Sequence, residues 1–486
     1  MKFKSTRFER KARIFLFIFE KKSFMRKNIL TLGLYALTFA FSLQVSAQAI
    51  PGTLNWYNKE GAGMATDKAY GLLKKKKSEP VIVAVIDSGV DIEHEDLQGK
   101  IWVNTKEIPN NKIDDDKNGY VDDVHGWNFL GNAKGENLDA ARLEKTRILA
   151  KLIDKYDGID PASIKSDEEF ELYQTVKNEI EGERAQYEPY LEMIKSGTLD
   201  AETKKYIEDQ LNYNLNVNYD DRSLIGDNPD DFNDTNYGNP DVEGPDALHG
   251  THVSGIICAI RGNDKGGDGV ADNVKIMSLR AVPNGDEHDK DIALAIRYAV
   301  DNGAKVINMS FGKSYSPHQE KVFEAFEYAD SKGVLLVHAA GNDAKDIDIE
   351  PNYPTSKYSF QELPLDHFLT IGASTKDKEE LVASFSNYGQ TGVDIFAPGL
   401  EIYNTVPQSA YQNLQGTSMA APMVTGVAAM LKSYFPTLSM KEIKDAMLST
   451  VVKYTVDEFA TKSVTGGVVN VYNAVKACQK LESSRK

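Results

Sequence analysis

The chain has 486 residues, 41% of them hydrophobic, which is enough for one large domain with an insertion or for two to three ordinary domains. Its formal net charge of −16 argues against nucleic acid or an anionic membrane as a partner. Two cysteines, Cys258 and Cys478, exclude a disulfide framework and allow at most one bridge. Because Cys258 lies in an apolar run, we favour a buried free thiol there.

The N-terminus has the pattern of a secretion signal. Basic residues at 26–27 precede the apolar run 29–43, and small residues at 45–47 form a cleavage pattern. We therefore assign residues 1–47 to a signal peptide. Either Met25 is the true start or residues 1–24 extend the signal. An uncleaved membrane anchor is the alternative.

Five apolar runs without alternation predict strands buried on both faces of a parallel sheet. The first covers residues 81–86 and ends in Asp87. Helical patterns at 291–300 and 319–331 separate later runs, and strands alternating with helices indicate an α/β fold. Active groups of such folds gather at the carboxyl ends of strands. The other four runs cover residues 274–279, 306–309, 334–339 and 368–371.

An acidic loop follows the first strand and has part of the spacing of a calcium loop. Asp114, Asp116 and Asn118 occupy positions 1, 3 and 5, and Asp122 occupies position 9. Position 12 is His125 and not glutamate, so the loop is not an EF-hand. The pattern predicts an oxygen cage for a structural calcium ion, with an ordinary Asp/Asn/Gly turn as the alternative.

Residues 131–243 differ from their surroundings because they hold charged helical patterns and no buried-strand run. We interpret them as a mainly helical insertion between residues 48–130 and residues 244–486, which together form one α/β domain. Its charged faces are expected to be solvated. The alternatives are that the insertion serves as a lid, as a substrate-positioning element or as a folding aid. The helical patterns cover residues 138–156, 168–195 and 201–213.

A glycine-led turn at residues 416–422 runs into an apolar helical pattern that extends to about Tyr434. Ser418 would lie in the first turn of this helix, where free backbone N–H groups and the helix dipole favour negative charge. An N-cap serine is the alternative. Two more helices are predicted, at 439–448 and near 469–481.

Three groups in the chain together match the needs of serine-based acyl transfer. Ser418 would attack a carbonyl, His249 would take and return its proton, and Asp87 would hold the imidazole. Each alone is weak evidence, because an aspartate after a strand or a histidine near a helix start is usually structural. The chain order Asp, His, Ser excludes the α/β-hydrolase and chymotrypsin orders.

The three segments at 85–90, 249–255 and 416–422 resemble those of the subtilisin-like serine proteases. The resemblance implies a three-layer parallel-sheet fold and a triad of Asp87, His249 and Ser418. It also implies an oxyanion hole formed by the Asn342 side chain and the Ser418 N–H. An asparagine at 342 disfavours the acid-active sedolisins.

The same resemblance suggests where a substrate binds. It implies a P1 pocket with two walls of small residues. It places residues 280–282 along the opposite edge of the substrate. It also implies that His252 has a structural role. The resemblance covers residues 55–130 and 244–480 but not the insertion, and no inhibitory pro-domain is evident. The wall residues are Ser310, Phe311, Gly312, Ala339, Ala340 and Gly341.

We therefore expect a monomeric secreted endopeptidase, located in the periplasm or outside the cell, that acts on proteins or peptides. It would need no cofactor for its chemistry, bind no nucleic acid and keep no membrane anchor after signal cleavage. The main alternative is a catalytically silent peptide-binding protein with the same fold. An esterase or peptide ligase that uses the same acyl-enzyme is a third reading.

Overall fold

The computed structural model describes residues 54–164, 167–362, 364–377, 380–454 and 459–485. The predicted signal peptide lies outside the described residues. By its internal contacts the chain divides into two units. The larger holds residues 50–186 and 209–486, and the described part of the smaller holds residues 187–208.

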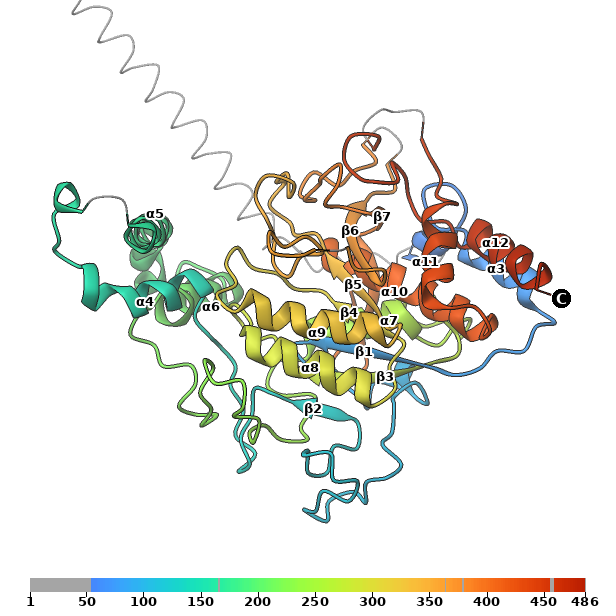
Figure 1. The fold of residues 1–486 in the computed structure, drawn as a ribbon, viewed down its shortest axis with the longest axis horizontal. Coiled ribbons are helices and arrows are strands. Elements are labelled where there is room, and N and C mark those ends of the chain that lie inside the picture. The colour runs from blue at the N-terminus through green and yellow to red at the C-terminus, as the bar shows by residue number, and fades with distance from the viewer. Residues whose placement is uncertain (1–53, 165–166, 363, 378–379, 455–458, 486) are drawn as a thin grey trace, which may run out of the picture. The chain divides into compact units, whose positions relative to one another are not determined.

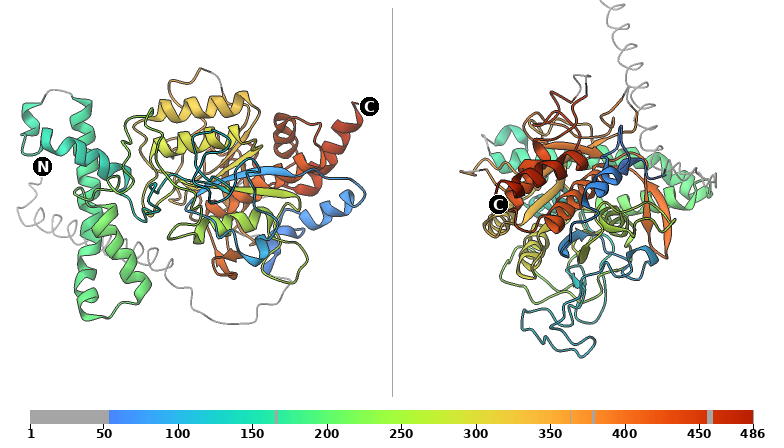
Figure 2. Two further views of the ribbon diagram at one scale, coloured as in Figure 1. Left: turned by 90° about the horizontal axis from the view of Figure 1, so that it is seen from below. Right: turned by 90° about the vertical axis from the view of Figure 1, so that its right-hand side faces the viewer.

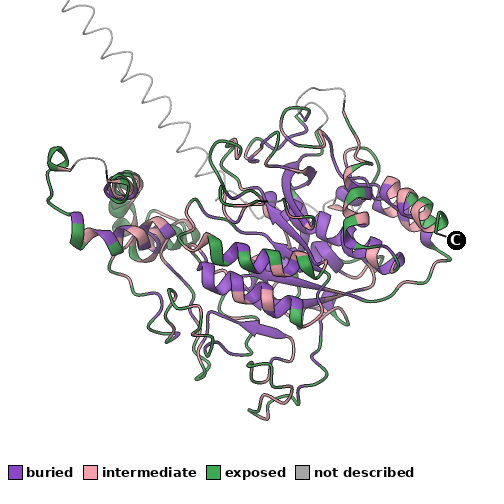
Figure 3. Ribbon diagram, in the orientation of Figure 1, coloured by how far each residue is buried: buried purple, intermediate pink, exposed green. Residues whose placement is uncertain are grey.

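The larger unit is built on a seven-stranded sheet in the order β2-β3-β1-β4-β5-β6-β7, in which every pair is parallel. The sheet confirms the predicted α/β class. All of its strands are buried, as apolar strands covered on both faces should be (Figure 3). The strands are β1 (Val81–Asp87), β2 (Gly126–Asn128), β3 (Val274–Arg280), β4 (Val306–Met309), β5 (Leu335–Ala339), β6 (Phe368–Ser374) and β7 (Ile395–Pro398).

Helices cover both faces of the sheet and make three layers (Figures 1 and 2). Alternate side chains of β1 point to the two faces of the sheet. Val83 and Val85 pack with α7 (Leu248–Cys258) and α10 (Thr417–Tyr434) on one face. Ala84 and Ile86 pack on the opposite face with α8 (Asp289–Asp301) and α9 (Gln319–Ser331). Beside α10 lie α11 (Met440–Leu448) and α12 (Val471–Ser483), and α3 (Thr66–Leu73) packs against α12.

Short elements complete the larger unit. An antiparallel hairpin, β8 (Ile402–Val406) and β9 (Ala410–Leu414), precedes α10. Sequence patterns did not predict this hairpin, β2 or β7, because these four short strands lack a long apolar run. The remaining short elements are η1 (Trp56–Asn58), η2 (Glu95–Leu97), η3 (Pro161–Ser163) and the π-helical turn η4 (Gln210–Asn214).

Three helices lie between residues 131 and 243. They are α4 (Glu144–Tyr156), α5 (Glu168–Ser196) and α6 (Ala201–Asp209). The predicted helix start at residue 138 is wrong, because residues 138–143 are extended. There Ala140 forms a parallel bridge with Asn284, so tertiary pairing overrides the helical pattern.

A buried ionic cluster joins the N-terminus of α4 to the segment before α8. The Arg147 side chain binds both carboxylate oxygens of Glu144 and donates to the backbone oxygens of Asp286 and Glu287. The ammonium group of Lys313 binds Glu144 Oε2, which Arg147 also contacts, at 2.7 Å. Burial disfavours the charge of Glu144, but Arg147 and Lys313 outweigh it and hold the pKa of Glu144 well below its usual range.

Two expectations from the sequence concern membranes and thiols. Among the described residues, no helix has the length and apolar character needed to cross a bilayer. Cys258 and Cys478 are both buried free thiols, so they form no bridge with each other.

Candidate active site

Asp87 and His249 meet at the carboxyl edge of the sheet. Asp87 is the last residue of β1, and His249 lies in the first turn of α7, which packs against β1. The His249 Nδ1 atom lies 2.7 Å from Asp87 Oδ1. A carboxylate can only accept, so Nδ1 carries the proton and Nε2 is left as the basic nitrogen.

The environment of His249 favours its protonated form. Burial would lower its pKa, but the charge and hydrogen bond of Asp87, helped by the charge of Asp246, raise it above the usual value for histidine. Asp87 itself is 2% exposed, and its Oδ1 also accepts the N–H of Ser88 at 2.8 Å. The aspartate is therefore fixed before any substrate binds.

Ser418 is the second residue of α10, in the turn where a helix leaves its backbone N–H groups without helical acceptors. Gly416 precedes it with φ of 147°, a backbone conformation that residues with a Cβ rarely adopt. This glycine lets the chain turn sharply from β9 into the helix. The Ser418 N–H therefore belongs to the positive end of the helix dipole, which favours negative charge nearby.

The side chain of Ser418 is held by Ser310 in the structure. Its Oγ donates to the Ser310 backbone oxygen at 3.1 Å, and Ser310 Oγ donates to the Ser418 backbone oxygen at 2.9 Å. The second bond has a cause in the sequence: Pro422 has no N–H, so the helix supplies no donor to the Ser418 carbonyl. The Ser418 hydroxyl proton is thus engaged by the Ser310 oxygen, and catalytic hydrogen bonds often tighten only when substrate binds.

Asn342 follows β5 and lies beside the Ser418 turn. Its Oδ1 accepts the backbone N–H of Thr417 at 2.8 Å and the Thr417 hydroxyl at 3.0 Å. Both bonds orient the amide so that its Nδ2 donor points away from Thr417. Thr417 Oγ1 also accepts the N–H of Gly341, which fixes the chain around Asn342.

The six predicted pocket residues continue two neighbouring strands. Residues 310–312 extend β4 and residues 339–341 end β5, so they form facing backbone segments. Asn352 lies between them: a Cβ on Gly312 would approach its Nδ2 to 2.6 Å, and a Cβ on Gly341 would approach the same atom to 3.2 Å. Sequence analysis missed Asn352, which reaches this place through the Lys313–Tyr353 bridge.

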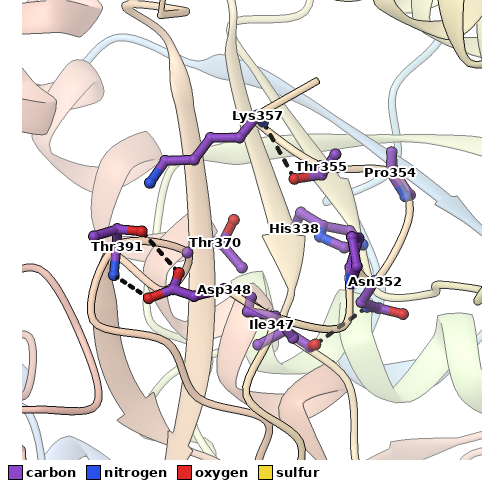
Figure 4. A pocket seen from close by; sticks show the side chains of 12 residues that line it. His338, Ile347, Asp348, Asn352, Pro354, Thr355, Lys357, Thr370 and Thr391 are labelled. Atoms are coloured by element: carbon purple, nitrogen blue, oxygen red, sulfur yellow. Dashed lines mark hydrogen bonds between the residues drawn. The ribbon is translucent and has the colours of Figure 1, made fainter. Parts of the chain in front are cut away.

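Behind this wall lies a cavity of about 140 Å³ (Figure 4). Asn352 Nδ2 donates to the Ala340 backbone oxygen at 3.1 Å, and His338 Nε2 is 2.8 Å from the Phe311 oxygen. Burial lowers the pKa of His338 to about 4, so the ring stays neutral and donates that bond. These two side chains hold the two wall segments in place.

His252 lies three residues after His249 in α7 and is fully buried. Its Nε2 is 3.0 Å from the Ile402 backbone oxygen and 3.2 Å from the Gln412 oxygen. Burial lowers its pKa to about 3, which keeps it neutral. It ties α7 to the β8–β9 hairpin, which fits the predicted structural role.

The acidic loop brings together only part of the predicted ligand set. Oxygens of Glu107, Asp114 and Asp116 lie within 4.8 Å of one another. Asn118 instead donates to Asp123, and the Asp122 carboxylate accepts backbone N–H groups at residues 111 and 112. Glu107 was missed because it precedes the loop motif by seven residues.

Comparisons with known proteins bear on the family to which the chain belongs. The model of the subtilase family matches residues 78–472. A thermophilic serine proteinase of Bacillus sp. (strain AK1) is 39% identical over 251 residues, 50% of this chain and 55% of the relative. Thermitase of Thermoactinomyces vulgaris is 38% identical over 234 residues, 47% of this chain and 75% of the relative.

Solved structures show the same fold. A protease of Pseudoalteromonas arctica PAMC 21717 superposes with a TM-score of 0.51 at 21% identity, covering 88% of this chain and 97% of that one. This chain spans about half the length of the thermophilic serine proteinase that it matches.

Proposed function

Because the chain belongs to the subtilase family, we propose that it is a serine endopeptidase whose acyl-enzyme forms on Ser418. The observation that carries this proposal is the 2.7 Å contact between His249 Nδ1 and Asp87 Oδ1. It fixes the tautomer in which Nε2 can accept a proton from a serine. Proteins and peptides are the proposed substrates.

In the proposed mechanism, substrate binding between residues 310–312 and 339–341 releases Ser418 Oγ from the Ser310 oxygen. Rotation of the serine side chain then brings Oγ to His249 Nε2. As Oγ attacks the scissile carbonyl, its proton passes to Nε2, and Asp87 stabilises the imidazolium. The imidazolium then protonates the leaving amine, and water hydrolyses the ester by the same steps in reverse.

Two donors would stabilise the oxyanion that forms during attack. One is the Ser418 N–H at the start of α10, and the other is Asn342 Nδ2, which the two bonds from Thr417 orient. Loss of one such donor costs about 10²–10³ in kcat, a magnitude known from subtilisin itself. No cofactor is required for these steps.

Labelling with a fluorophosphonate probe at neutral pH tests the proposal. Intact protein should be labelled and should hydrolyse a generic protein substrate, and Ser418→Ala should do neither. Absence of labelling in correctly folded protein would favour the silent peptide-binding alternative. Labelling with ester cleavage but no peptide cleavage would favour an esterase.

We also propose export of the chain and a structural calcium ion. Export rests on the signal pattern at residues 1–47. The donor set of Glu107, Asp114 and Asp116 fits calcium, which prefers clustered carboxylate oxygens. Asn118 and Asp122 would act by shaping the loop.

A further inference from the structure

A cleft of about 350 Å³ lies next to the Asp87–His249 pair. One wall is formed by residues 310–312, which also belong to the proposed P1 pocket. The other wall is the segment 282–285 that follows β3. A peptide whose P1 side chain enters that pocket would therefore lead its preceding residues through this cleft.

Residues 138–141 reinforce the second wall from outside. The Asp139 oxygen accepts the Asn284 N–H at 2.9 Å, and the Asn284 oxygen accepts the Ala141 N–H at 3.0 Å. A Cβ on Gly285 would lie 2.2 Å from the Ala141 oxygen, so only glycine fits there. This pairing places the Asp139 side chain at the cleft.

Among the described residues, three acidic side chains outside the proposed triad line this cleft: Asp139, Asp246 and Glu287. Asp139 and Asp246 are exposed, and no cationic side chain among the described residues forms an ion pair with either. Glu287 is 2% exposed, and its Oε1 is buried without a hydrogen-bond partner. Burial raises the pKa of Glu287 to about 8, so a cation beside it would restore its charge.

Besides His249, Arg280 is the one basic residue that lines the cleft in the part of the chain that the structure describes. It is 1% exposed, and its guanidinium donates to the Ser88 oxygen, to Asn128 Oδ1 and to the Leu138 oxygen. Each of its three nitrogens therefore already donates one hydrogen bond to the protein. It offsets part of the negative charge, yet the cleft keeps more acidic than basic groups.

We propose that this cleft is a specificity site for a cationic side chain. The substrates that it favours carry lysine or arginine within the few residues that precede the scissile bond. Asp139 and Glu287 receive the cation on the side of the second wall, and Asp246 adds negative charge near His249. The inference rests on the proposed endopeptidase activity and gives residues 138–141 a part in choosing the substrate.

Matched quenched fluorescent peptides test this specificity. The peptides differ only in arginine, glutamine or glutamate at one of the three positions before P1. At one or more of these positions, kcat/KM should be about tenfold higher for arginine than for glutamine and lowest for glutamate. The arginine preference should arise mainly in KM and weaken as salt rises.

Two variants identify the residues responsible. Asp139→Asn should lower the arginine-to-glutamine ratio about threefold, as expected for an exposed charge, and Glu287→Gln should lower it further. Asp154→Asn is the matched control, because Asp154 is an exposed acid of α4 that does not line the cleft. The arginine-to-glutamine ratio of Asp154→Asn should equal that of the unmodified protein.

A ratio near one at all three positions would overturn the inference while leaving peptide hydrolysis intact. An unchanged arginine-to-glutamine ratio in Asp139→Asn would also overturn the inference. This variant alone decides the test if Glu287→Gln does not fold. If no peptide is cleaved and Ser418 is not labelled, the proposed endopeptidase activity is wrong and the inference falls with it.

Discussion

Removal of Arg147 should destabilise the larger unit strongly. Arg147→Met keeps most of the side-chain volume but deletes the bonds to the Asp286 and Glu287 oxygens and half of the pairing of Glu144. Arg147 is 5% exposed, so water cannot replace these bonds well. Breaking a buried ion pair costs about 3–5 kcal/mol, and Lys313, which remains on Glu144, places the expected loss near the lower end.

Urea unfolding at neutral pH, in a Ser418→Ala background that prevents self-digestion, would measure this loss. The control is Lys155→Met on the same helix, because Lys155 pairs with Glu169 at the surface. An exposed pair contributes little to stability, because water screens both charges. If Arg147→Met loses no more free energy of unfolding than Lys155→Met, the buried cluster does not anchor α4.

The free energy of unfolding lost in Arg147→Met should depend on pH, because the pKa of Glu144 is lowered in the folded state. A carboxyl with a depressed folded pKa contributes stability above its unfolded pKa of about 4.3, and that contribution is lost as pH falls below it. The stability difference between Arg147→Met and its parent should therefore be largest near neutral pH. It should narrow below about pH 4.

Three further predictions concern the active site and the acidic loop. Thr417→Val should lower kcat about tenfold with little change in KM, because it removes the hydroxyl that orients Asn342; a change in KM alone would contradict this role. Asp246→Asn should lower the pKa of His249 and so move the acid limb of the kcat/KM profile to lower pH; an unmoved limb would show that Asp246 does not act on the base. A calcium chelator should lower the Tm by several degrees in the parent but not in Glu107→Gln, and an unchanged parent Tm would count against bound calcium.

The central sheet was predictable because its strands are long and apolar on both faces. The five predicted strands agree with β1, β3, β4, β5 and β6 to within a few residues at their ends. The runs before Asp87 and Asn342 also indicated the edge where both residues lie. In contrast, β2 has three residues and β7 ends in proline, so neither has a pattern that stands out.

Residues whose position depends on long-range pairing could not be predicted in the same way. Asp139 reaches the cleft because residues 138–141 pair with Asn284, and Asn352 reaches the pocket through the bridge at Lys313. Each pairing joins segments separated by loops, and local sequence carries no signal of it. The same holds for Glu107, which the fold brings to a loop whose motif starts seven residues later.

Pro422 removes one helical hydrogen bond, and Ser310 takes the vacant acceptor on Ser418. The proposed nucleophile and the first residue of the proposed pocket wall are thereby coupled mechanically through two reciprocal bonds. A substrate side chain that pushes residues 310–312 outward would pull on the start of α10 as well. An ill-fitting substrate would thus misalign the attacking oxygen in addition to binding weakly, so selectivity at this wall would be expressed in kcat as well as in KM.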